Sequence, residues 1–234
     1  MSCAFANVAH REPTDQRAVT MQKVRELAEK LKSSVDEPVV LTRTCDEIRQ
    51  LASSHPDNSS KIGPRGVEAI VKTCLAPHLD HASVVASACG ALGALASGNF
   101  INKKRMSSQP VVKLVAAAMR QHPTNATVQL HAMKAIQQIA QSNSRNAARA
   151  VHHGVHTLVW AAMTMSPDRD GDEGQAAGVK RQLRQAGGSL FGVLTAAGPG
   201  ILEKIVESVV KTMGSTDPGD ELAQGNACQV GRVG

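Results

Sequence analysis

The sequence predicts an all-α protein built from repeated helical units, and three observations lead to this fold class. Residues of the same kind recur every 44 positions. Within each unit, apolar residues are spaced three or four apart, as they are along one face of a helix. No segment alternates apolar and polar residues in the way a half-buried strand does. We therefore expect helices throughout the folded part of the chain.

The 44-residue period is clearest at three asparagines, Asn58, Asn102 and Asn146, each of which follows an apolar run. The same step relates apolar positions on both sides of the asparagine, so the register extends through the whole unit. A period of about 40–47 residues is the sequence sign of stacked helical repeats. The matching positions are Val40/Val84/Val128, Cys45/Cys89/Met133, Ile48/Leu92/Ile136, Leu51/Leu95/Ile139, Val67/Val111/Val155 and Ile70/Leu114/Leu158.

Each unit is expected to contain three helices in a fixed order. A short helix follows the asparagine, and Gly66, Pro110 or Gly154 is expected to end it. A second helix follows, such as residues 111–122, and a polar turn leads to the third. In residues 128–141 the apolar side chains fall at i, i+4, i+8 and i+11, which predicts a buried helical stripe.

A fourth unit keeps this pattern after an insertion. Its residues align at a step of 55, which takes Ile139 to Leu194. The additional residues fall in the acidic, glycine-rich segment 166–178, which we expect to be a loop. The predicted parts of the chain are a disordered arm at 1–19, a repeat domain at 20–213 and a flexible tail at 214–234.

These units resemble armadillo repeats. The shared features are a third helix rich in small residues, a Leu–Ala or Ile–Ala pair that closes it, an asparagine just after, and a glycine before the next unit. The pairs here are Leu51–Ala52, Leu95–Ala96 and Ile139–Ala140. The resemblance implies a right-handed α-solenoid, or superhelix, of about four repeats whose third helices line a concave groove. It also implies a non-enzymatic scaffold that binds an extended peptide or a helix in that groove.

The resemblance places the groove residues between the buried positions of each third helix. Nuclear-import adaptors of this fold carry a tryptophan and an asparagine, four residues apart, at the last two positions of each set. This chain lacks that pair in every set, so we do not expect it to recognise import signals. The sets are Arg43, Asp46 and Gln50, then Ser87, Gly90 and Ala94, then His131, Lys134 and Gln138.

Small residues occupy the middle of this predicted groove. Gly90 and Ala94 have almost no side chain, and their neighbours in the groove come from the units on either side. We therefore expect a shallow, open patch there, which a side chain or a helix of a partner could approach closely.

Cations also recur with the period, at Lys61, Arg105 and Arg149, and at Lys204 in the shifted fourth unit. This basic ladder supports a second hypothesis, a solenoid that binds nucleic acid or another acidic ligand. The alternative is a set of solvated positions near helix ends, where the helix dipole favours a cation. Net charge is only +6, and aromatic residues, on which single-strand binders stack bases, make up 2%. We therefore expect a protein partner rather than nucleic acid.

The most basic short stretch, NFINKKRM at residues 99–106, lies where two units join. Only Arg105 in it belongs to the basic ladder. Lys103 and Lys104 are special to this unit, since the matching residues are serines in one neighbouring unit and alanines in the other. A nuclear-targeting role for these two lysines is disfavoured because they are expected to lie inside a folded helix.

No arrangement in the sequence predicts an enzyme, a metal site or a bound cofactor. Cys45 and Cys89 occupy apolar repeat positions and are expected in the core. The histidine-rich stretch 152–156 has no cysteine or carboxylate nearby in sequence to complete a zinc site. Five cysteines without CxxC spacing fit a reducing compartment, so we expect the cytoplasm, with the nucleus as the alternative. No stretch approaches the roughly 20 apolar residues of a membrane span.

The last unit has no third helix of useful length after residue 213. Its apolar face therefore lacks the cover that a following unit would give. We expect a partner, or further chain of a longer protein, to cover it.

Overall fold

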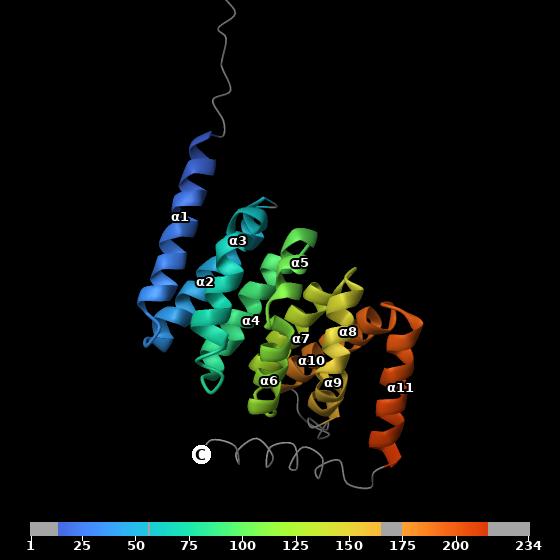
Figure 1. The fold of residues 1–234 in the computed structure, drawn as a ribbon. Helices are drawn as coiled ribbons and strands as arrows, with labels where there is room; N and C mark the ends of the chain where they lie inside the picture. Colours follow the sequence, from blue (N-terminus) through green and yellow to red (C-terminus); the bar gives the residue numbers. More distant parts are fainter. Residues whose placement is uncertain (1–13, 56, 165–174, 215–234) are drawn as a thin grey trace, which may run out of the picture.

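The computed structural model describes residues 14–55, 57–164 and 175–214, and every regular element in those ranges is a helix (Figure 1). Eleven are α-helices, and one is a short π-helix, η1. The prediction of an all-α protein is confirmed for this part of the chain. The elements are α1 (Thr14–Ser33), α2 (Pro38–Ser54), α3 (Asn58–Ile70), η1 (Val71–Leu75), α4 (Ala82–Ala96), α5 (Phe100–Ser108), α6 (Val111–Gln121), α7 (Ala126–Ala140), α8 (Ser144–His152), α9 (Val155–Thr164), α10 (Gln175–Thr195) and α11 (Pro199–Gly214).

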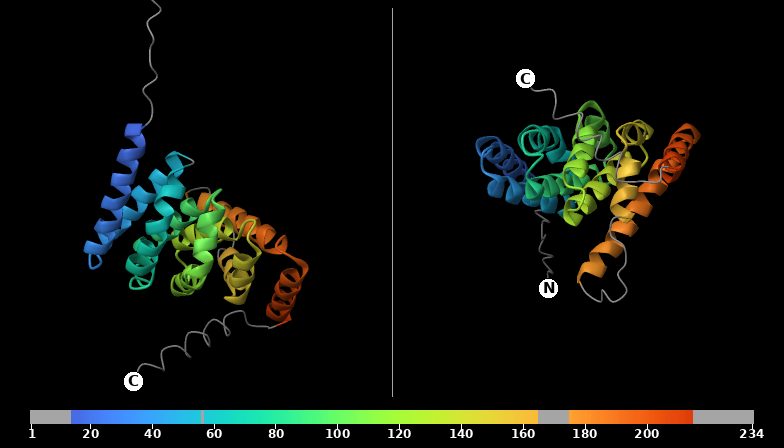
Figure 2. Two further views of the ribbon diagram at one scale, coloured as in Figure 1. Left: turned by 45° about the horizontal axis from the view of Figure 1, so that its top comes forward. Right: turned by 90° about the horizontal axis from the view of Figure 1, so that it is seen from below.

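The helices follow one another in space in the order of the chain, from α1 at one end to α11 at the other (Figures 1 and 2). Helix α4 packs along both α2 and α7, and α7 packs on along α10. The shorter helices α3, α5, α6, α8 and α9 cover one side of this α2–α4–α7–α10 layer. The extensive contacts of each helix are therefore with helices close to it in the sequence.

Three predicted boundaries are shifted. Helix α1 begins at Thr14, so the last six residues of the predicted arm are helical, since no glycine or proline interrupts residues 14–33. Helix α10 begins at Gln175, so residues 175–178 belong to a helix rather than to the predicted loop. Helix α11 includes Gly214. The rest of the arm, the insertion and the tail lies outside the described residues.

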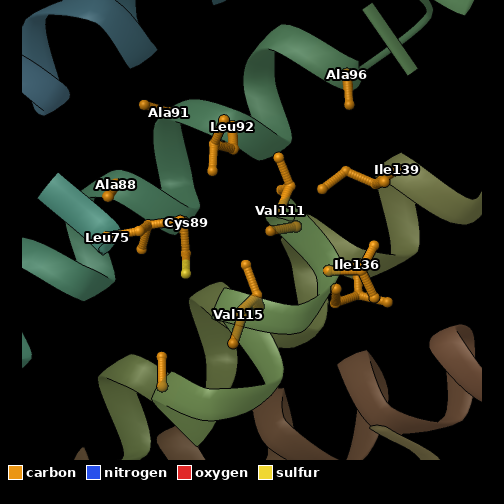
Figure 3. Close-up of a cluster of buried hydrophobic side chains, with 14 of the residues drawn as sticks. Leu75, Ala88, Cys89, Ala91, Leu92, Ala96, Val111, Val115, Ile136 and Ile139 are labelled. Carbon is orange, nitrogen blue, oxygen red and sulfur yellow. The ribbon is translucent and has the colours of Figure 1, made fainter. Parts of the chain in front are cut away.

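The core runs between the two layers. In α7, Val128, Ala132, Ile136 and Ile139 are all fully buried, as their helical spacing predicts. They join side chains from η1, α4 and α6 in one apolar cluster (Figure 3). Small residues let the helices approach closely, because a Cβ on Gly93 would lie only 3.2 Å from Ala135 Cα. Because the helices pack this closely, adding or removing a single methyl group in the core changes the stability of the fold.

The three periodic asparagines, Asn58, Asn102 and Asn146, each donate a hydrogen bond to the carbonyl seven residues earlier, near the end of the preceding long helix, and we call them the asparagine seam. The Asn102 side-chain amide donates to Leu95 O at 2.9 Å and to Ser59 O at 2.7 Å. Asn146 repeats this arrangement, donating to Ile139 O at 3.1 Å and to Lys103 O at 3.0 Å. Both amides are buried, so each bond satisfies a carbonyl that water does not reach.

The seam needs space in the preceding short helix. A Cβ on Gly63 would lie 1.9 Å from Asn102 Oδ1, so only glycine fits beneath that amide. One period later, Ser107 occupies the matching position and donates its hydroxyl to Asn146 Oδ1 at 2.7 Å. The residue at this position therefore either leaves room for the next asparagine or bonds to it.

A second periodic contact involves two histidines. The His78 side chain meets Val35 O through Nε2 at 2.7 Å, and His122 meets Leu79 O in the same way at the same distance. Because a carbonyl only accepts hydrogen bonds, Nε2 carries the proton in both rings. His78 and His122 follow the ends of η1 and α6, and each contacts the turn of the preceding unit.

Gly66 does not end a helix, contrary to the expectation. Helix α3 continues through it to Ile70 and then into η1. Gly66 is buried, and a Cβ there would lie 2.7 Å from Ile62 Cγ2, so the glycine serves close packing instead. Pro110 and Gly154 do separate helices: Pro110 precedes α6, and Gly154, with φ 71°, stands between α8 and α9.

No helix in the described part of the chain is long and apolar enough to cross a membrane.

Gly63→Ala should lower the free energy of unfolding, although alanine favours helices over glycine. The new methyl group must displace the Asn102 amide from two buried carbonyls, at a cost of about 2–3 kcal/mol that outweighs a propensity gain of about 1 kcal/mol. Chemical denaturation followed by circular dichroism measures the change.

Gly192→Ala in α10 is the matched control, because nothing lies within 4 Å of a Cβ at that position. It should leave stability unchanged or raise it by up to about 1 kcal/mol. Equal effects of the two substitutions would contradict the assigned role of Gly63.

Candidate interaction surface

The predicted groove residues lie on three neighbouring helices, α2, α4 and α7, of the long-helix layer. Arg43, Gln50 and Lys134 are exposed to solvent. Five others are half-buried, and Ser87 is buried with 7% of its surface exposed. The half-buried residues are Asp46, Gly90, Ala94, His131 and Gln138. The fold therefore brings the three sets onto adjacent helices. Ser87 was expected to be accessible to a partner, but it is buried.

A hydrogen-bonded group connects α2 to α4 on this surface. Arg49 donates to Asp46 Oδ1 from Nη2 at 3.1 Å and from Nε at 3.3 Å. The other carboxylate oxygen, Asp46 Oδ2, accepts from Ser87 Oγ at 3.3 Å. This explains why Ser87 is buried, since its hydroxyl is turned toward α2. Arg49 was not among the predicted groove residues.

The expected open patch at Gly90 is not present. A Cβ at Gly90 would lie 3.0 Å from Arg49 Cδ and 3.4 Å from His131 Nδ1. The arginine from α2 and the histidine from α7 therefore cover the glycine from both sides. The absence of a side chain at Gly90 lets Arg49 and His131 lie close to its backbone. The accessible groups at this point are therefore these two side chains rather than the backbone of α4.

The tautomer of His131 follows from its partner. Its Nδ1 lies 2.9 Å from Ala86 O, and because a carbonyl only accepts, Nδ1 carries the proton. In the neutral ring Nε2 is then an acceptor. The centre of the surface thus offers an arginine, a carboxylate and an imidazole within one small area, flanked by Arg43, Gln50, Lys134 and Gln138.

The basic ladder is not a row of equivalent cations. Arg105 donates from Nη1 to Asn102 Oδ1 at 3.2 Å, and Arg149 donates to the carbonyl of Ser107. Lys61 is half-buried, and Lys204 is exposed on α11. Two of the four side chains therefore already donate hydrogen bonds within the protein, Arg105 to a seam asparagine and Arg149 to the backbone of α5.

Lys103 is buried, with 6% of its surface exposed. Its Nζ donates to Gln141 O at 2.8 Å, at the C-terminal end of α7, and burial lowers its pKa. A cation at that end of a helix is favourable. Lys103 therefore joins two units and is not accessible, whereas Lys104 and Arg105 of the NFINKKRM stretch are exposed.

The cysteines of the described chain are buried. Cys45 Sγ lies 3.5 Å from Cys74 Sγ, and the hydrogen bond between them, with burial, raises the pKa of Cys45. Burial raises the pKa of Cys89 to about 12. Neither Cys45 nor Cys89 is positioned to act as a thiolate nucleophile. Among the described residues, no group of three or more His, Cys, Asp or Glu side chains is arranged to hold a metal ion.

Comparison with protein-family models, curated proteins and solved structures gave no match. The function is therefore inferred from the residues of this chain.

Cys89 should react with iodoacetamide at pH 8 far more slowly than glutathione in the same solution. A pKa of about 12 leaves roughly one thiol in 10⁴ ionised at that pH, and the fold shields it. Mass spectrometry of the labelled peptides gives the rate. Labelling in guanidinium should reach the glutathione rate, whereas fast labelling of the native protein would contradict the buried position.

Proposed function

We propose that this protein is an armadillo-like α-solenoid that serves as a non-enzymatic scaffold and binds an extended peptide or a helix of another protein. The binding surface is the outer face of α2, α4 and α7. The single observation that carries the proposal is that polar side chains of α2 and α7 lie on either side of the small residues Gly90 and Ala94 of α4, on a face whose opposite side is the core. We propose the cytoplasm, with the nucleus as the alternative, as the compartment.

The recurrence of contacts supports the solenoid. Asn102, Asn146 and the two histidine contacts each join a unit to the one before it at the same sequence separation of 43 residues. A structure in which each unit contacts mainly its neighbours can present one long surface, because its elements align along a single axis.

The chemistry of the surface favours a peptide with acidic and polar side chains. Arg43, Arg49 and Lys134 outnumber the one carboxylate of the group, Asp46. Gln50 and Gln138 can each donate to and accept from the backbone of an extended chain. Charges at the rim of such a surface accelerate association more than they add affinity.

The binding of nucleic acid through the basic ladder is less well supported. Arg105 and Arg149 already donate hydrogen bonds inside the protein. A ligand that neutralised several cations would bind with an affinity that falls steeply with salt, so a salt titration separates the two functions.

The double variant Arg43→Glu/Lys134→Glu should lose the partners that the unaltered protein captures from a cell lysate, as quantified by mass spectrometry. Reversing two exposed charges on α2 and α7 repels an acidic peptide while leaving the core intact. We expect capture to fall by at least tenfold, since each reversed charge removes about 1 kcal/mol or more.

Lys113→Glu/Arg145→Glu is the matched control, with the same charge change at exposed positions of α6 and α8. It should retain those partners. The proposal fails if both variants lose the partners equally, or if capture depends on added nucleic acid and disappears on nuclease treatment.

A further inference from the structure

Two buried thiols meet where α2 packs near η1. Cys45 Sγ lies 3.5 Å from Cys74 Sγ, although the two residues are 29 positions apart in the chain. Both side chains are fully buried, and both are free thiols. The two sulfur atoms are in contact, so no other atom has to be displaced before they approach further and form a disulfide between the two helices.

This pair of thiols is special to the first of the repeated units. The 44-residue step takes Cys74 to an alanine in each of the next two units, and those alanines are buried as well. Packing at this position therefore does not require a thiol. The two sets of matching positions are Cys45/Cys89/Met133 and Cys74/Ala118/Ala162. Cys74 also lies in η1, and π-helical turns are rare and frequently occur at functional sites.

The hydrogen bonds around Cys74 show which thiol ionises first. Thr73 Oγ1 donates to Ala69 O at 2.8 Å, so its oxygen is left to accept from the Cys74 thiol at 3.5 Å. The Cys74 sulfur in turn accepts from the Cys45 thiol. This bond from Cys45 lowers the pKa of Cys74 although the residue is buried, and the same bond, together with burial, raises the pKa of Cys45. Cys74 is therefore the first of the two to become a thiolate.

We propose that Cys45 and Cys74 form a reversible disulfide when the protein is exposed to a peroxide, and that this bond fastens α2 to η1. The proposal does not depend on the peptide-binding function, because neither thiol belongs to that surface.

The reaction has two steps. The Cys74 thiolate attacks one oxygen of hydrogen peroxide, the O–O bond breaks, and a sulfenic acid and a hydroxide form; the hydroxide takes up the proton that Cys74 released. The Cys45 sulfur then displaces the hydroxyl group of the sulfenic acid, which leaves as water with the Cys45 proton. Two thiols and one peroxide thus give one disulfide and two water molecules. Two electrons pass from the sulfurs to the peroxide.

The position of the pair in the fold determines how an oxidant reaches it. Because both thiols are buried, the reaction proceeds while the surrounding helices open locally. The pair lies toward the α1 end of the stack, where a unit has fewer neighbours to hold it than in the middle (Figure 1). Hydrogen peroxide is little larger than water and needs only a small opening. Oxidised glutathione needs a larger one, so it should react more slowly.

The test is disulfide mapping of the full chain after exposure of the native protein to hydrogen peroxide. Remaining thiols are blocked with iodoacetamide in guanidinium, and the protein is digested with trypsin without reduction. Mass spectrometry should find residues 44–49 linked to residues 73–103, with a mass two hydrogen atoms below the sum of the two peptides. Dithiothreitol should separate them again.

Two matched variants assign the link, since Cys74 and Cys89 lie in the same tryptic peptide. Cys89→Ala replaces a thiol that is equally buried, and the linked pair should still form. Cys74→Ala introduces the residue that the later units have at this position, and it should abolish the link and leave Cys45 as a free thiol.

Oxidation should also raise the guanidinium concentration at which the chain unfolds, because the disulfide constrains the unfolded state. Circular dichroism measures the midpoint before and after peroxide treatment. Cys89→Ala should show the same upward shift, whereas Cys74→Ala should show none.

Four outcomes would overturn the proposal. These are no linked pair from the native protein, a sulfinic acid at Cys74 in place of the link, oxidation of Cys89 to the same extent as Cys74, or a lower unfolding midpoint after oxidation. If Cys74→Ala fails to fold, the unaltered chain and Cys89→Ala still decide between these results and the expected one.

Discussion

The hydrogen bonds of the asparagine seam are the constraint on which the rest of the structure depends. One amide group of Asn102 satisfies a carbonyl at the end of α4 and another in α3, so it fixes two helices relative to α5 at once. Asn146 does the same for the next set of helices. Losing such a bond costs more free energy than losing an exposed one, because the carbonyls that it satisfies are shielded from water. The requirement for a glycine at 63 follows from keeping the Asn102 amide in place.

The seam also sets the orientation of the long helices. Once the short helices are fixed on one side, α2 and α7 bury their apolar stripes and leave polar side chains outward, while α4 between them is almost entirely buried. The Asp46–Arg49–Ser87 group then spans α2 and α4 on that outer face. The proposed interaction surface is thus a consequence of how the units stack.

The sequence predicted the parts of this structure that are periodic. The asparagines, the buried stripe of α7 and the core position of Cys89 all recur with the period, and the structure has them where expected. What the sequence did not reveal depends on contacts between units. Arg49 covers Gly90 because α2 and α4 lie close together, and Gly66 lies inside α3 at a point that packs near Leu95 of α4.

Hydrogen–deuterium exchange of an Asn102→Ala variant tests most directly whether the seam holds neighbouring units together. Because each helix contacts mainly its neighbours in sequence, removing one amide should loosen the structure locally. The account predicts faster exchange in α3, α4 and α5, with α9 and α10 exchanging as in the unaltered protein. Unchanged exchange in α3 to α5, or uniformly faster exchange through to α10, would contradict it.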